Sequence, residues 1–154
     1  FLDAYAFSTE GIVGFTIGRK NKLSFLSVVK NSIQISFYTS LIIAVLYLLL
    51  FKEIINIMTD IEILRFISYQ HFIWIIIIPP VASFCYQLDG IFIGASQTKE
   101  IRNAMIISVI GFIAASIYLT DYFENHGLWF SLMLFMILRA LTLRFYFNKI
   151  LRKF

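Results

Sequence analysis

Residues 31–51 read NSIQISFYTSLIIAVLYLLLF and contain no charged side chain. A helix of roughly 20 predominantly apolar residues is long enough to cross the roughly 30 Å of hydrocarbon in a lipid bilayer. A helix on the surface of a soluble protein would show polar residues at regular spacing, and from residue 41 onward this run has no polar face. The segment therefore predicts a helix that spans a membrane.

Four other stretches have the same character. Asp, Glu, Lys and Arg are absent from 66–88 and 103–120, and 127–143 is interrupted only by Arg139, whose side chain is expected to reach towards the lipid headgroups. The stretch 4–18 is short and contains Glu10, so we expect it to be the end of a span that begins upstream of this chain. No signal peptide is visible at the start of the chain. The predicted helices cover approximately 4–18, 31–51, 66–95, 103–122 and 127–147.

The composition of the chain also indicates a membrane protein. Of its 154 residues, 60% are hydrophobic and only 14% are charged, and the mean hydropathy is +0.84. The charged share is about half that of soluble domains, which leaves too little polar surface for a fold in water. The predicted fold class is therefore all-α, a polytopic transmembrane helical bundle of about five spans over residues 1–154. The lone Cys85 has no partner for a disulfide and is expected to be a buried thiol.

The density of basic residues alternates from one connecting segment to the next. Four lie in 19–30, two in 99–102 and five in 139–153, whereas 52–65 holds two against three acidic residues. The segment 121–126 holds none. Because cytoplasmic loops gather Lys and Arg, we predict an integral protein of the plasma (inner) membrane with a cytoplasmic C-terminus. The net charge of +4 then indicates contact with membrane lipid rather than with nucleic acid.

Two carboxylates, Glu10 and Asp89, fall inside predicted spans. An ionisable group at that depth is costly unless it faces a cavity or a partner, so both are candidates for binding a cation or a substrate. A structural role stays open for each. For Asp89 the structural alternative is a position near the cytoplasmic helix end, where it is solvated or paired with Lys99.

The pair Pro79-Pro80 lies in the middle of the third predicted span. Two missing backbone donors and the ring clashes predict a kink, and broken helices often line transporter sites. Tyr86 and Gln87 follow the apolar run and are further candidates for a cleft wall. A kink with no functional role is the alternative.

Two small-residue motifs occur, Gly14-x-x-x-Gly18 and Gly90-x-x-x-Gly94. Glycines four residues apart lie on one face of a helix and allow two backbones to approach closely. We interpret both motifs as helix-packing sites.

The sequence lacks the signatures of several enzyme classes, including the zinc helix His-x-x-Glu-His, a phosphate-binding loop and the Gly-x-Ser-x-Gly turn. His71 and His126 fall at the predicted outer boundaries, away from the carboxylates. No catalytic residue, metal site or cofactor is therefore predicted.

Residues 86–105, YQLDGIFIGASQTKEIRNAM, resemble the tenth helix and the following loop of the multidrug and toxic compound extrusion (MATE) transporters, with the DinF-like branch nearest. Residues 1–21, FLDAYAFSTEGIVGFTIGRKN, are similar to the eighth helix, and 125–143, NHGLWFSLMLFMILRALTL, to the twelfth. Within the resemblance, the most specific sequence match is Asp89-Gly90 followed by the segment 98–103.

The resemblance implies twelve helices in two lobes, of which this chain supplies helices eight to twelve and needs the N-terminal lobe as its partner. It implies export of small organic compounds, often cationic, in exchange for protons or sodium ions. Asp89 occupies the position of the tenth-helix carboxylate that binds a cation in the sodium-linked branch. In the DinF-like branch the proton site is usually on the first helix, which this chain does not contain.

Three other functions stay open. A lipid-linked oligosaccharide flippase of the same superfamily would line its cleft with basic residues, and here the basic residues are in loops. An embedded lipid-modifying enzyme would need clustered polar groups at one depth. A purely structural subunit would make Glu10 and Asp89 dispensable.

Overall fold

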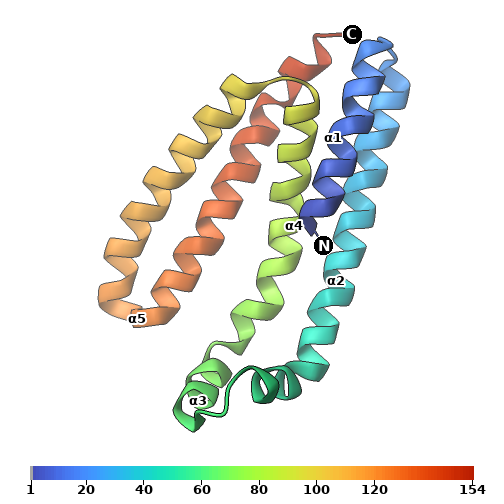
Figure 1. Ribbon diagram of the computed structural model, residues 1–154. Helices are drawn as coiled ribbons and strands as arrows, with labels where there is room; N and C mark the ends of the chain where they lie inside the picture. The colour runs from blue at the N-terminus through green and yellow to red at the C-terminus, as the bar shows by residue number, and fades with distance from the viewer. Residues whose placement is uncertain (1) are drawn as a thin grey trace.

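The computed structural model of the protein describes residues 2–154 and is built of helices alone within that range (Figure 1). Phe1, the first residue of the segment that resembles the eighth helix, lies outside the described residues. The elements are α1 (Leu2–Gly18), α2 (Lys22–Met58), α3 (Glu62–Gln70), α4 (Phe72–Gly94) and α5 (Thr98–Leu151). The predicted all-α membrane bundle is confirmed.

The long helix α5 is a hairpin of two arms. It reverses at Glu124, whose backbone is not helical, with φ 49° and ψ −129° (Figure 1). At 1.5 Å per residue each arm is about 39 Å long, enough to cross the hydrocarbon. By length and composition α2, α4 and α5 are the three helices that can cross a membrane within residues 2–154, and α1 is shorter at 17 residues. The two arms of α5 correspond to the predicted spans 103–122 and 127–147.

The region predicted as one helix over 66–95 is two helices. The chain leaves the helical conformation at His71 and separates the nine-residue α3 from α4. Arg65 of α3 stabilises the turn that precedes this helix. Its Nε donates to the Thr59 carbonyl at 2.8 Å, and its Nη2 pairs with Asp60 Oδ1 at 3.3 Å. Polar residues at helical spacing in 62–70 make α3 amphipathic, which distinguishes it from the uniformly apolar span.

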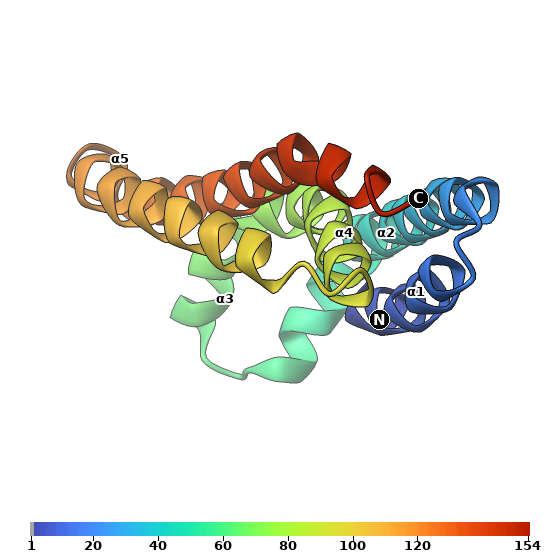
Figure 2. The ribbon, with the colours of Figure 1, turned by 90° about the horizontal axis from the view of Figure 1, so that it is seen from above.

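The helix α4 lies at the centre of the bundle, with α1 and α2 on one side and α5 on the other (Figures 1 and 2). The turn from α1 to α2, the turn from α4 to α5 and the C-terminus share one end, at the top of Figure 1. The two turns are alike: Lys20 and Ser96 are left-handed, with φ of 53° and 54°. The basic residues of 19–30 and 99–102 therefore gather at the same end. Which side of a membrane this end faces stays a prediction.

The core is concentrated at this basic end. Phe25 of α2 is fully buried, and its ring centroid lies 6.0 Å from that of Phe147 and 5.2 Å from that of Phe154. Glu100 at the start of α5 pairs with Lys149 near its end, with Oε1 and Nζ 2.9 Å apart. The core cluster consists of Val13, Phe25, Val29, Leu88, Ile91, Phe92, Ala95, Ala104, Leu143, Phe147 and Ile150. The ion pair thus joins the two ends of the α5 hairpin to each other, and the core cluster packs both ends against α4. The outer faces of α2 and α5 expose mostly apolar side chains, as expected towards lipid.

At the opposite end the two histidines meet. The rings of His71 and His126 stack with centroids 4.5 Å apart, and Trp74 Nε1 donates to His126 Nδ1 at 3.0 Å. Within residues 2–154 no group of three His, Cys, Asp or Glu side chains is placed to hold a metal ion. The stacked pair instead joins the beginning of α4 to the turn of α5.

Glu124→Gly is expected to raise the free energy of unfolding by about 1 kcal/mol, because glycine adopts positive φ without the steric cost of a Cβ. Glu53→Gly, in the regular helix α2, is the matched control and is expected to lower the same quantity by about 1 kcal/mol. Unfolding of the complete protein in detergent micelles measures both. Equal losses in the two variants would contradict strain at Glu124.

Candidate functional site

A cavity of about 260 Å³ lies between α1, α4 and the second arm of α5. Three residues predicted as cleft candidates, Glu10, Tyr86 and Asp89, line it together. The remaining lining residues are Asp3, Ala6, Phe7, Gly90, Ile93 and Arg139. The contributing residues recur at spacings of three and four on α1 and on α4, so each helix presents one face to the cavity.

Asp89 forms an ion pair with Arg139. Oδ2 of the carboxylate lies 3.0 Å from Nη2 of the guanidinium, and the two side chains are only 12% and 15% exposed. The expectations that Arg139 reaches towards the headgroups and that Asp89 is solvated or paired with Lys99 are therefore wrong. The reason is that the second arm of α5 brings Arg139 directly beside Asp89, and an unpaired charge in hydrocarbon is more costly than an internal pair.

The ion pair leaves two buried atoms without partners. Asp89 Oδ1 and Arg139 Nε form no hydrogen bond with any residue in 2–154. Buried polar atoms in folded proteins are nearly always bonded, and each exception costs free energy. Oδ1 is therefore a buried acceptor that no described residue uses, and a proton would satisfy it.

Gln87 lies on a different face of α4 and does not line this cavity. It is fully buried against α1, where its Oε1 accepts a hydrogen bond from Thr9 Oγ1 at 2.8 Å. Its Nε2 has no partner among the described residues. The structure thus places Gln87 in the contact between α1 and α4, whereas the sequence suggested a cleft wall.

The glycines of α4 set how closely α1 approaches. A Cβ at Gly90 would overlap the backbone carbonyl of Ala6, and one at Gly94 would overlap that of Glu10. Gly14 faces Gly94 at ordinary van der Waals distance. A Cβ at Gly18 would meet no described atom within 4 Å, so the packing role inferred for Gly18 is not seen.

The two prolines lie away from the carboxylates. Helix α4 continues through Pro79 and Pro80, and the Pro80 carbonyl accepts a hydrogen bond from Ser83 Oγ at 2.7 Å. Pro80 lines an apolar groove that α4 forms with α2 and α5. The structure does not bring the prolines to the cavity of Asp89.

Sequence reasoning missed Asp3 and misinterpreted Arg139. Asp3 lies seven residues before Glu10, two helical turns along the same face of α1, and this spacing could have identified it. Arg139 is the single charge in an apolar run, as Asp89 is in its own. Two isolated opposite charges in separate spans are a signal for an internal pair.

An apolar bundle of membrane length, with an ion pair inside it beside an acidic cavity, defines a polytopic membrane protein. A family model described as MatE matches residues 1–119. The chain is 34% identical over 142 residues to DNA damage-inducible protein F of Escherichia coli (strain K12), covering 92% of this chain and 31% of that relative. The chain belongs to the MatE family, as its resemblance predicted.

The chain spans about a third of the length of the curated relative it matches. No solved structure matches it. Arg139 lies beyond the residues that the family model matches, so the assignment of the ion pair rests on the geometry of this bundle.

Proposed function

We propose that the protein is a cation-coupled antiporter that exports small organic compounds across the membrane by alternating access. Membership of the MatE family supports a transporter. Coupling of export to a cation is supported by the buried ion pair of Asp89 and Arg139 beside the cavity. No cofactor is needed for this exchange beyond the coupling ion.

The charge of the cavity favours cationic compounds. Three carboxylates, from Asp3, Glu10 and Asp89, line it with a single guanidinium. An excess of negative charge in a partly enclosed site attracts an organic cation. The aromatic rings of Phe7 and Tyr86 add faces on which such a cation can lie.

Coupling follows from competition at Asp89. A cation that binds Oδ1 weakens the attraction of the carboxylate for Arg139 and for a cationic substrate, so loading the coupling ion favours release of the substrate. Because Arg139 already holds Oδ2 of Asp89, Oδ1 alone remains on that carboxylate. One oxygen is enough for a proton, whereas a sodium ion would need further oxygen ligands from Glu10 or Asp3. The coupling ion is therefore a proton or, less readily accommodated, sodium.

The cavity is less suited to the alternative of a lipid-linked oligosaccharide flippase. Such a protein needs cationic groups that are free to bind a pyrophosphate. Arg139 is the basic residue that lines the cavity, and Asp89 already binds it.

We further propose that the protein resides in the plasma (inner) membrane with its basic end, and hence its C-terminus, in the cytoplasm. The gathering of Lys and Arg at one end of the bundle supports this orientation. The partner of the bundle is then the N-terminal lobe of the complete protein, which closes the substrate cleft.

The test is efflux of a cationic dye from cells that express the complete protein, under imposed proton or sodium gradients. Asp89→Asn is expected to abolish gradient-driven efflux when efflux is expressed per amount of folded protein in the membrane. The control is Asp121→Asn, an exposed carboxylate at the turn of α5, which is expected to leave efflux unchanged. Unchanged efflux in Asp89→Asn would place coupling elsewhere, and no dye movement by the unaltered protein would favour the flippase.

A further inference from the structure

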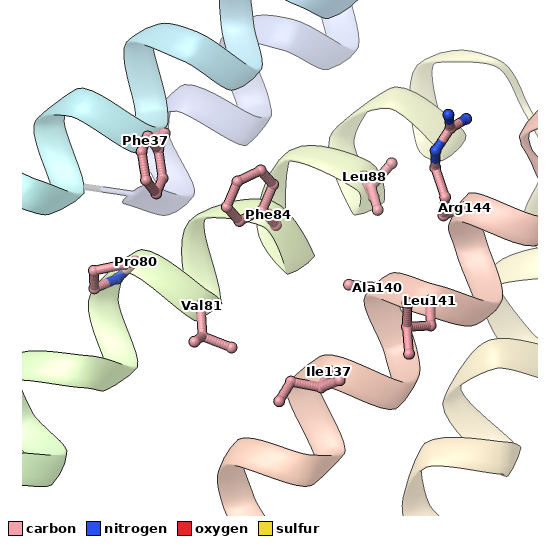
Figure 3. Close-up of a pocket in the computed structure, with 9 residues that line it drawn as sticks. All are labelled: Phe37, Pro80, Val81, Phe84, Leu88, Ile137, Ala140, Leu141 and Arg144. Carbon is pink, nitrogen blue, oxygen red and sulfur yellow. The ribbon is translucent and has the colours of Figure 1, made fainter.

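A second hollow lies on the opposite side of α4 from the carboxylates. It is a groove of about 480 Å³ between α2, α4 and the second arm of α5 (Figure 3). Its lining residues are Phe37, Pro80, Val81, Phe84, Leu88, Ile137, Ala140, Leu141 and Arg144. Val81, Phe84 and Leu88 follow each other at helical spacing, about half a turn away from Tyr86, Asp89 and Ile93. The groove and the acidic cavity are therefore separate.

The groove opens to the outside of the bundle along apolar side chains. Leu141 is 61% exposed and Phe84 is 41% exposed, and both border the opening. Arg144 is the only charged residue of the lining. The apolar lining of the groove is therefore suited to bind a flexible hydrocarbon chain.

Arg144 gives the groove a polar end. Figure 3 shows it beside Leu88, with Phe37 and Pro80 at the far end. Arg144 takes part in no ion pair within residues 2–154, and its guanidinium carbon lies 5.6 Å from the centroid of the Phe147 ring. This leaves its donors free for an external anion.

The same end carries further positive charge. A neighbouring hollow of about 530 Å³ is lined by Arg144 together with Arg152 and with Lys149, whose charge is already paired with Glu100. Basic side chains next to a membrane-spanning helix attract anionic headgroups with about 1 kcal/mol each. The charge at this end is complementary to a phosphate.

We propose that this groove is a binding site for one anionic phospholipid, with an acyl chain along α4 and the phosphate on Arg144. From Pro80 to Leu88 the wall runs about 12 Å along the helix axis, which holds the upper part of an acyl chain. This lipid site is distinct from the proposed transport site and does not depend on it.

The test places a photoreactive benzophenone amino acid at Leu141 in the complete protein, reconstituted into vesicles of equal phosphatidylglycerol and phosphatidylcholine. After illumination, mass spectrometry identifies what is attached to residue 141. Phosphatidylglycerol is expected to exceed phosphatidylcholine about fivefold, the ratio that one favourable charge contact of about 1 kcal/mol gives at RT of about 0.59 kcal/mol. Arg144→Gln is expected to reduce this ratio to about one, and Arg144→Lys to preserve most of it.

The matched control is Arg102→Gln, which removes an exposed basic residue at the same end of the bundle that lines neither hollow, and it is expected to keep the preference. Attachment of lipid without headgroup preference in the unaltered protein would overturn the proposal, because the groove would then only contact bulk lipid. Attachment to another segment of the same protein would overturn it as well, since that segment would occupy the groove.

Discussion

Arg139→Gln is expected to lower the free energy of unfolding by about 3–5 kcal/mol, because it leaves the Asp89 carboxylate buried without its counter-ion. Asp89→Asn is expected to cost a comparable amount, since it leaves a guanidinium unpaired within the bundle. Unfolding of the complete protein in detergent micelles, followed by the loss of helical signal, measures both. Arg152→Gln, an exposed basic residue of the tail, is the control and is expected to change stability by less than about 0.5 kcal/mol.

The double variant Asp89→Asn with Arg139→Gln separates structure from transport. Removing both charges leaves two neutral side chains that can bond to each other, so the double variant is expected to recover most of the lost stability. Its coupled efflux is expected to stay absent, because no titratable group remains at this position. Losses that simply add would show that the two residues do not interact. Recovery of coupled efflux would show that the pair is only structural.

The sequence was sufficient for the all-α membrane fold class because long apolar segments are recognised from local composition. Residues 31–51 need no tertiary contact to be recognised as apolar along their whole length. Boundaries were less accurate where capping and turns decide them. Helix α2 begins at Lys22, well before the predicted span, because the Asn21 side chain accepts a hydrogen bond from the Ser24 backbone at 3.0 Å and caps the first turn.

The candidate site was predictable only in part. Glu10 and Asp89 stood out as charges within apolar runs, but Arg139 lies 50 positions beyond Asp89, and its place beside it depends on where α5 reverses. That reversal occurs at Glu124, a residue type with no preference for positive φ. The partner of a buried charge is thus a property of topology.

Gly90→Ala is expected to separate α1 from α4 and to lower the stability of the bundle. The added Cβ would overlap the Ala6 carbonyl, which is backbone and cannot rotate away. Overpacking costs typically 1–3 kcal/mol, and the better helix propensity of alanine offsets about 1 kcal/mol at most. The expected net loss of stability is about 1–2 kcal/mol, with a similar loss for Gly94→Ala.

The same substitution also tests the site, because Gly90 lines the cavity between Glu10 and Asp89. A wider spacing of α1 and α4 moves the α1 carboxylates away from Asp89, so efflux is expected to fall even at temperatures where the variant remains folded. The matched control is Gly11→Ala on α1, where a Cβ meets no described atom within 4 Å, and it is expected to be neutral or slightly stabilising. Stability and efflux of both variants are measured in the complete protein. If Gly90→Ala behaved like Gly11→Ala, the close contact of α1 with α4 would not hold the cavity together, and the carboxylates of α1 could not act with Asp89 at one site.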